Sequence, residues 1–211
     1  MIREKHSSHS DKVARPSGDS IEGLARAAKS CRACDIGDRA TQTVFGEGSA
    51  HAEVMLVGEQ PGNQEDLTGH PFVGPAGKLL DKALLGAGIA REKVYITNIV
   101  KHFNSIQRGK WRIHKRPNAE EIAACRPWLE AEIAIIRPVV IVCLGASAAQ
   151  ALISRDFRVT RHRGELQRSS YGPMIAATVH PSSVLRAPEA KARDLQMQEL
   201  VAHVQKIALS L

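Results

Sequence analysis

The sequence predicts an α/β fold with three layers, in which helices cover both faces of a central, mainly parallel sheet of four strands. The first observation is a set of four short aliphatic runs without the strict alternation of a strand that is exposed on one face. The second is that segments with helical periodicity separate these runs. Alternation of this kind is typical of a parallel sheet with right-handed crossovers.

The aliphatic runs have the length and composition of buried strands. They are Glu53–Gly58, Val94–Val100, Val139–Gly145 and Met174–His180. Residues 1–20 differ from the rest, because they are polar, rich in Ser, His and Lys, and without periodicity. We therefore expect a mobile tail at 1–20 and a single domain from 21 to 211.

The segments between the strands show helical patterns. They are Pro75–Ala87, Asn118–Ile136, Gly145–Ser154 and a C-terminal segment from about Pro188 to Leu211. Pro127 would kink the second helix or split it in two. In the last helix, the four apolar side chains of Leu195, Leu200, Val204 and Ile207 are expected on roughly one side.

The composition fits a globular protein with an acidic partner. The 211 residues are 43% hydrophobic, and the formal net charge of +7 favours a polyanion such as DNA. No run approaches the roughly 20 apolar residues that cross a bilayer, and the first six residues lack a secretory core. We therefore expect a cytoplasmic monomer without a membrane partner, in which cysteines are thiols or metal ligands rather than disulfides.

Polar side chains follow the carboxyl ends of the predicted strands. Glu59 and Gln60 follow the first strand, Asn98 lies near the end of the second, and His180 ends the fourth. Ligands bind at this edge in open α/β sheets. The sequence therefore predicts a site there.

Two turns at this edge have residues suited to chemistry. Gly58-Glu59-Gln60-Pro61-Gly62 predicts a tight turn whose backbone approaches a ligand, although an ordinary turn with an exposed glutamate fits as well. In the segment 180–186, His180 would donate a hydrogen bond to a developing anion. Ser182, Ser183 and Arg186 would hold a phosphate. The alternative is a turn into the last helix with a serine as N-cap.

A third segment, Gly69–Gly77, places Phe72 in a glycine-rich loop. A phenylalanine there would stack on a flat base, a contact that contributes roughly 1–3 kcal/mol in single-strand binding proteins. The alternative is a side chain that only anchors the loop.

Together with Tyr95-Ile96-Thr97-Asn98, these segments resemble the uracil-DNA glycosylase superfamily, specifically its iron–sulfur branch, over about residues 25–205. The resemblance implies that the protein excises uracil from DNA. It also implies that Phe72 stacks on the flipped uracil, Asn98 reads its Watson–Crick edge and His180 stabilises the departing base. Gly58, Gln60 and Asp66 complete the implied substrate-binding set, Asp66 by positioning Glu59 or the basic loop described below.

The chemistry of uracil excision agrees with these residue types. Uracil leaves as an anion while the sugar becomes cationic, so a hydrogen-bond donor at a uracil oxygen and a negative charge near C1′ are needed. An asparagine amide pairs with O4 and N3–H of uracil together, whereas cytosine presents the opposite pattern. The base must also be flipped out, which costs least from a single strand, so single-stranded DNA is the preferred substrate.

The cysteines are Cys31, Cys34, Cys125 and Cys143. The first two form a close pair, but 17 residues separate the last two, whereas a zinc ribbon usually has a second close pair. Spacing alone leaves an iron–sulfur cluster, zinc or no metal open. The resemblance implies a 4Fe–4S cluster with these four ligands and a structural role.

A basic loop, Gln107–Pro117, leaves the same edge of the predicted sheet. Lys110, Arg112, Lys115 and Arg116 would contact phosphates, and Trp111 would stack or anchor the loop. The surrounding positive charge should keep His114 neutral and nucleophilic. A solvated loop with a spectator histidine is the alternative.

The segment Lys110–His114 resembles the insertion of the UdgX group, whose loop histidine binds DNA covalently. That resemblance implies that His114 attacks the sugar C1′ after uracil leaves, with Glu59 stabilising the cationic sugar and orienting or deprotonating His114. The group's commoner loop has a second basic residue where this chain has Trp111. Two alternatives stay open, namely a glycosylase that uses water as nucleophile and a non-catalytic iron–sulfur module that binds nucleic acid.

Overall fold

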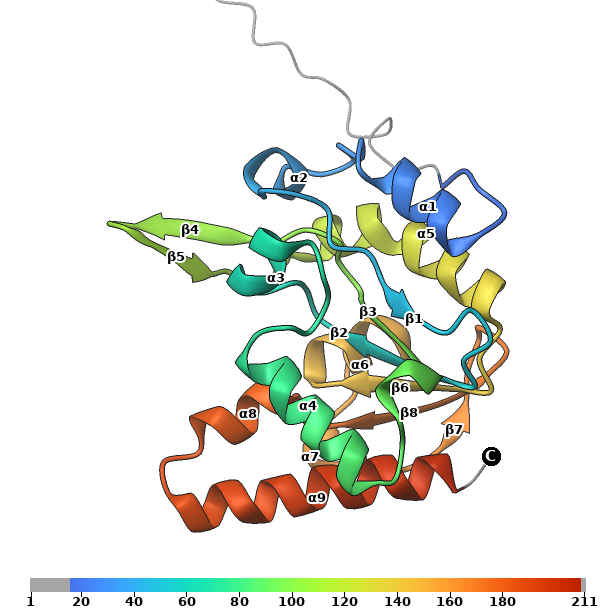
Figure 1. Ribbon diagram of the computed structural model, residues 1–211, viewed down its shortest axis with the longest axis vertical. Coiled ribbons are helices and arrows are strands. Elements are labelled where there is room, and N and C mark those ends of the chain that lie inside the picture. Colours follow the sequence, from blue (N-terminus) through green and yellow to red (C-terminus); the bar gives the residue numbers. More distant parts are fainter. Residues whose placement is uncertain (1–15, 210–211) are drawn as a thin grey trace, which may run out of the picture.

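A six-stranded sheet forms the centre of the computed structural model, which describes residues 16–209 (Figure 1). Its strand order is β1-β3-β2-β6-β8-β7. The four central strands are parallel and match the four predicted ones: β2 (Val54–Gly58), β3 (Val94–Asn98), β6 (Val140–Leu144) and β8 (Met174–Thr178). The predicted α/β fold is confirmed.

Two short strands close the sheet at its edges. β1 (Glu47–Gly48) pairs antiparallel with β3, and β7 (Gln167–Arg168) pairs antiparallel with β8. Each has only two residues, which is too short to produce a periodic pattern in the sequence. These strands were therefore not predicted.

Helices cover both faces of the sheet, as Figure 1 shows. One face carries α4 (Pro75–Gly86), α8 (Pro181–Arg186) and α9 (Ala190–Ala208), which also contact one another. The opposite face carries α1 (Ile21–Ala28), α5 (Ala119–Ile136), α6 (Ala146–Leu152) and α7 (Val159–His162). Three shorter elements lie in the connections: α2 (Ile36–Arg39), α3 (Asn63–Thr68) and the 3₁₀ turn η2 (Arg91–Lys93).

Two helices differ from their sequence patterns. Pro127 lies inside α5 without splitting it, and a capping box between Asn118 and Glu121 fixes the start of that helix. In α9, Leu195 is 58% exposed, whereas Leu200, Val204 and Ile207 are buried. The prediction that Leu195 lies on the same side of the helix as the other three is wrong, because five residues at about 100° each place it roughly 140° from Leu200.

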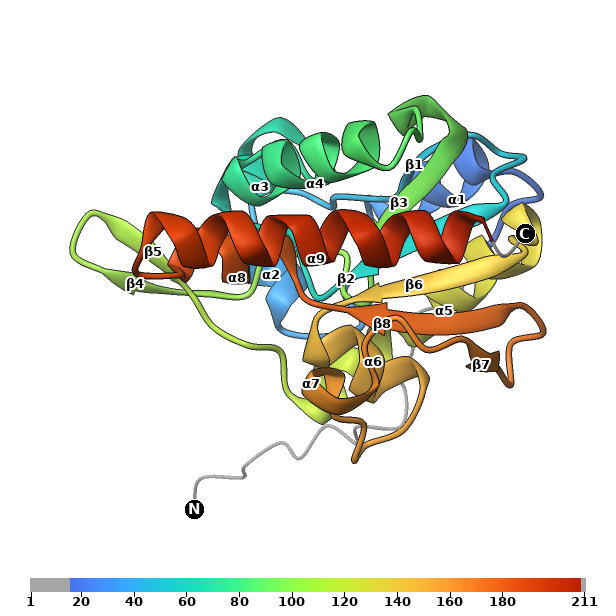
Figure 2. The same cartoon turned by 90° about the horizontal axis from the view of Figure 1, so that it is seen from below.

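A two-stranded hairpin of β4 (Ser105–Arg108) and β5 (Trp111–His114) overlaps the predicted basic loop and begins two residues before it. Gly109 and Lys110 form its turn, and Gly109 takes the positive φ of 59° that tight hairpin turns require. The hairpin projects from the body of the molecule (Figure 2).

The predicted tail lies almost entirely outside the described residues, since 1–15 are not described. Ser20 is the N-cap of α1 and accepts a hydrogen bond from Gly23 N. Among the described helices, none is long and apolar enough to cross a membrane. The predicted end of the last helix, at 210–211, also lies outside the described residues.

Candidate active site

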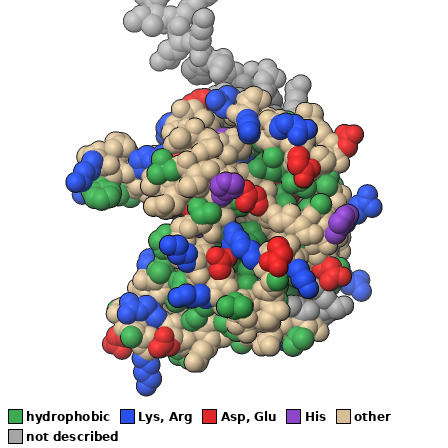
Figure 3. All heavy atoms as spheres, in the orientation of Figure 1, with side chains coloured by type: hydrophobic (Ala, Val, Ile, Leu, Met, Phe, Trp, Pro, Cys, Tyr) green, Lys and Arg blue, Asp and Glu red, His purple; other side chains and the backbone are tan. Residues whose placement is uncertain are grey.

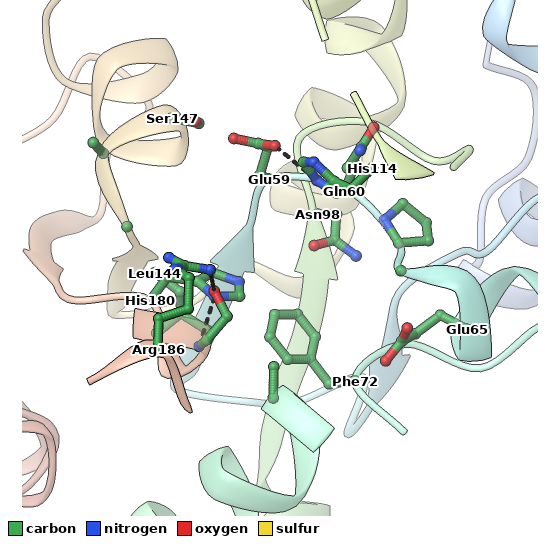
Figure 4. A pocket seen from close by; sticks show the side chains of 16 residues that line it. Glu59, Gln60, Glu65, Phe72, Asn98, His114, Leu144, Ser147, His180 and Arg186 are labelled. Atoms are coloured by element: carbon green, nitrogen blue, oxygen red, sulfur yellow. Dashed lines mark hydrogen bonds and ion pairs between the residues drawn. The ribbon is translucent and has the colours of Figure 1, made fainter. Parts of the chain in front are cut away.

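A cavity of about 560 Å³ opens at the carboxyl edge of the parallel strands (Figure 4). This volume is in the range of small-molecule sites. Eight of the predicted site residues line it: Glu59, Gln60, Phe72, Asn98, His114, His180, Ser182 and Arg186. The cavity therefore lies at the edge of the sheet where the sequence predicts a site.

Asn98, the last residue of β3, presents an unpaired amide oxygen to this cavity. Its side chain is 2% exposed, and its Oδ1 has no hydrogen-bond partner among the described residues. A buried polar atom without a partner costs free energy until a donor binds it. Gly58 makes the approach possible, because a Cβ there would lie 2.4 Å from Oδ1. Asn98 is thus prepared for a ligand that donates a hydrogen bond.

Phe72 lies beside Asn98 in a strained backbone conformation. Its φ is 55°, a region that non-glycine residues rarely adopt, and such strain is concentrated at functional sites. Gly77 allows the turn, since a Cβ there would lie 1.7 Å from the Phe72 carbonyl oxygen. The Phe72 ring lies 5.9 Å from that of His180, with an interplanar angle of 32°. The two rings together form an aromatic wall of the cavity.

His180 is itself the N-cap of α8, the position that the sequence alternative gave to a serine. Its Nδ1 accepts a hydrogen bond from Ser182 N at 3.1 Å and contacts Ser182 Oγ at 2.8 Å. Because Nδ1 is an acceptor, the proton of the neutral ring is on Nε2. Arg186 donates to Ser182 Oγ, and Ser183 Oγ donates to the His180 carbonyl. The turn therefore holds His180 with an N–H donor available to a ligand.

Burial lowers the pKa of His180 to about 4, and the neighbouring Arg186 and His114 act in the same direction against Glu59. In the unfolded chain, His180 binds a proton near pH 6.5. The buried neutral ring therefore contributes its full stability above that pH, and this contribution is lost as the pH falls toward 4. When the pH is lowered from 7 to 4.5, we expect the free energy of unfolding of the His180→Gln variant to fall by about 2–3 kcal/mol less than that of the parent protein. Urea unfolding at both pH values measures this difference, and equal losses would contradict it.

Glu59 lies at the start of the turn after β2 and faces His114 on the hairpin. Its Oε1 lies 3.2 Å from His114 Nε2, and its Oε2 lies 3.9 Å from Arg116 Nε. Burial alone would raise the pKa of Glu59, but hydrogen bonds with His114 and Ser147 and the charges of His114 and Arg116 lower it overall. Glu59 is therefore a carboxylate at neutral pH, held against an imidazole.

Gln60 fastens the base of the hairpin rather than presenting a free amide. Its Nε2 donates to the carbonyls of Asn104 and Lys115, and its Oε1 accepts from Asn104 N. These bonds hold the two ends of the hairpin beside the β2 turn. Gln60 thereby lines the cavity and also positions His114.

Asp66 and Arg112 form a second anchor for the hairpin. Asp66 is fully buried in α3, outside the cavity lining, and binds Arg112 Nη1 and Thr41 N. Arg112 also donates to Asn63 and to the Thr41 hydroxyl. The structure thus places Asp66 where it positions the loop, and it turns Arg112 toward the protein. Lys110, another predicted phosphate ligand, lies at the hairpin turn over the Trp111 ring.

Two further polar residues line the cavity that the sequence reasoning missed. Ser147, in the first turn of α6, lines the cavity with Glu59 and lowers the pKa of that carboxyl. It follows the end of the third predicted strand, so the strand-end argument could have included it. Glu65 accepts a hydrogen bond from Gly74 N at 2.7 Å and so holds the loop of Phe72. Nothing in the local sequence distinguished this glutamate from an exposed one.

Three of the four cysteines lie together between α1, α2 and α5. Cys31 Sγ accepts from Trp128 Nε1 and Cys125 Sγ accepts from Lys101 N, both at 3.3 Å. Burial raises the pKa of Cys125 to about 12, and Cys34 and Cys31 add to the increase although Lys101 opposes it. N–H donors to sulfur are characteristic of the surroundings of iron–sulfur clusters. The group of thiols is consistent with such a cluster.

Cys143 lies apart from this group. It is buried in β6, and burial alone raises its pKa, without a contribution from another cysteine. Within residues 16–209, no three His, Cys, Asp or Glu side chains are grouped so that they could hold one metal ion. The ligands of a cluster bind different iron atoms and stand farther apart than those of a single ion.

A match to a protein-family model identifies the family of this chain. Residues 45–205 match the model of the uracil DNA glycosylase superfamily. The chain belongs to this superfamily. It is 40% identical to the type-4 uracil-DNA glycosylase of Archaeoglobus fulgidus over 178 residues, which cover 81% of this chain and 86% of the relative.

Other superfamily members are similar as well. The type-4 uracil-DNA glycosylase of Thermotoga maritima is 38% identical over 181 residues, 85% of this chain and 91% of the relative. The type-5 uracil-DNA glycosylase of Pyrobaculum aerophilum is 32% identical over 155 residues, 64% of this chain and 63% of the relative. The matched region contains Glu59, Asn98, His114 and His180, so the cavity belongs to the part that this chain shares with the family.

Proposed function

We propose that this member of the superfamily is a DNA-repair hydrolase that recognises uracil in DNA and cleaves its N-glycosidic bond in the cavity at the strand ends. The observation that carries the proposal is the buried, unpaired Oδ1 of Asn98 beside Phe72 and His180. A uracil stacked on Phe72 offers N3–H to Oδ1 and O4 to the amide N–H of Asn98. This pairing supplies the missing donor and excludes cytosine, whose edge has the opposite polarity.

The remaining groups match the charges of the reaction. As the bond between C1′ and N1 breaks, the electron pair leaves with uracil and the sugar becomes cationic. The Nε2–H of His180 donates to a uracil oxygen, where negative charge develops. The Glu59 carboxylate lies across the cavity and stabilises the cationic sugar. The charge on Glu59 is maintained by His114, Ser147 and Arg116.

We further propose that His114 captures the sugar. The ring nitrogen with the lone pair bonds to C1′, and the proton on the other nitrogen passes to Glu59, whose Oε1 lies 3.2 Å from Nε2. Uracil is released, and the product is a neutral imidazole joined to the deoxyribose. Gln60 and the pair of Asp66 and Arg112 support this step, because they fix the hairpin that carries His114.

Denaturing electrophoresis with a uracil-containing single strand tests both proposals. We expect uracil release together with a DNA band that stays attached to the protein. His114→Ala should release uracil without this band. Free abasic DNA from the parent protein, with no attached band, would indicate the alternative in which water is the nucleophile. Uracil-independent binding without base release would contradict the glycosylase itself.

The proposed cofactor is a 4Fe–4S cluster on Cys31, Cys34 and Cys125, which would fasten α1 and α5 to the sheet. Because Cys143 lies apart, the fourth ligand is better supplied by His102. Thr43 Oγ1 donates to the Ala28 carbonyl and therefore accepts from His102 Nε2, which leaves the lone pair on Nδ1. The buried His102 ring lies beside Gly37, whose N–H donates to the Cys34 carbonyl.

Iron content distinguishes the two ligand sets. We expect Cys125→Ser and His102→Ala to lose iron and visible absorbance, and Cys143→Ala to keep both, because Cys143 packs in the sheet. Iron per chain is measured on the purified proteins, and circular dichroism controls for folding. Loss of iron from folded Cys143→Ala would return Cys143 to the ligand set, as the sequence predicted.

A further inference from the structure

The register of the β4–β5 hairpin divides its side chains between two faces. Directly paired residues of antiparallel strands share a face. The pairs Ser105–His114 and Gln107–Arg112 form the inner face, where His114 meets Glu59 and Arg112 meets Asp66. The pairs Ile106–Ile113 and Arg108–Trp111 form the opposite, outer hairpin face.

The outer hairpin face is apolar, aromatic and exposed. Trp111 is 65% exposed, Ile106 49% and Ile113 43%, and the described residues leave them uncovered. Large apolar side chains gathered on a surface mark an interaction site more often than chance. Figure 3 shows hydrophobic and basic side chains together on this projection. This face does not hold the hairpin to the rest of the protein, because the contacts that do so are made by the inner face.

The charge and position of this face indicate its partner. Residues 105–117 contain no acidic side chain, and Lys110 Nζ lies 5.4 Å from the Trp111 ring centroid, at the hairpin turn. His114, on the same strand as Trp111, lines the cavity. DNA that enters the cavity therefore passes the hairpin, where Lys110 and Arg108 can contact its phosphates.

We propose that the outer hairpin face is a stacking platform for unpaired bases next to the flipped uracil. This inference rests on the proposed function and deepens it, because it names single-stranded DNA as the substrate and Trp111, Ile106 and Ile113 as its further contacts. Unpaired bases offer their flat faces to an indole, and such stacking tolerates any sequence. In a duplex these faces are already stacked within the helix.

Tryptophan fluorescence with uracil-free DNA tests the platform without chemistry. The chain has two tryptophans, and Trp128 is 3% exposed, so the exposed Trp111 reports contact. We expect oligothymidylate to quench this signal, and the same strand in a duplex to quench it far less. Because Trp111→Ala lacks this reporter, its affinity is measured by the anisotropy of a labelled strand. It should bind oligothymidylate about 5- to 150-fold more weakly, which is the contribution of one stacked base. Trp111→Phe should restore most of the affinity.

Leu85→Ala is the matched control, because Leu85 is 80% exposed on α4 and outside the cavity. It should leave the affinity for oligothymidylate unchanged. Unchanged single-strand affinity in folded Trp111→Ala, or equal losses for single strand and duplex, would overturn the platform. Failure of the proposed function is distinguishable, since it would appear as absent uracil release while the quenching is retained.

Discussion

Replacing His180 with alanine is expected to slow uracil release by about 10²- to 10³-fold, the usual effect of removing one donor to a developing anion. The His180 ring is neutral, and Ser182 N occupies its Nδ1, so the Nε2–H is directed to the ligand. The effect should appear in the rate of a single turnover rather than in DNA binding, because the negative charge develops only as the bond breaks.

The matched control is His162→Ala. His162 lies on α7, outside the cavity, and pairs with the exposed Glu165. We expect its rate of uracil release to equal that of the parent protein. A His180→Ala variant that is folded and releases uracil at the parent rate would show that another group stabilises the departing base.

Replacing Asn98 with leucine, which has a similar volume, is expected to reduce the efficiency of uracil excision by about 30- to 10⁴-fold. Two polar groups of the bound uracil would then be buried without partners, at about 1–3 kcal/mol each. The unpaired Oδ1 of the free protein is removed by the same change, so thermal stability should not fall. Reduced excision with retained binding of uracil-free single strands is the expected combination, and unchanged excision would show that Asn98 does not read the base.

The parallel strands and their carboxyl edge were predictable from the sequence because both depend on local pattern. Aliphatic runs identify β2, β3, β6 and β8, and the edge rule then brings Glu59, Asn98 and His180 together. The same rule could have identified Ser147. The principal catalytic candidates were thus accessible from one sequence.

Features that depend on distant contacts were not predictable in this way. The hairpin β4–β5 is held by Arg112 to Asp66, 46 residues away in the chain, and by Gln60. Its strands have only four residues each, too few for their alternation of polar and apolar side chains to identify them in the sequence. Cys143 illustrates the same limit, since the spacing of cysteines does not reveal that β6 carries this thiol away from the other three.

The number of uracils released by each protein molecule tests the central claim most directly. Excess uracil-containing single-stranded DNA is incubated with the protein, and free uracil is measured to completion. If the cavity excises uracil and His114 then bonds to C1′, release stops at one uracil per chain, with an equal amount of protein–DNA adduct that His114→Ala does not form. Continued release far beyond one uracil per chain, without an adduct, would contradict capture by His114, and no release at all would contradict excision.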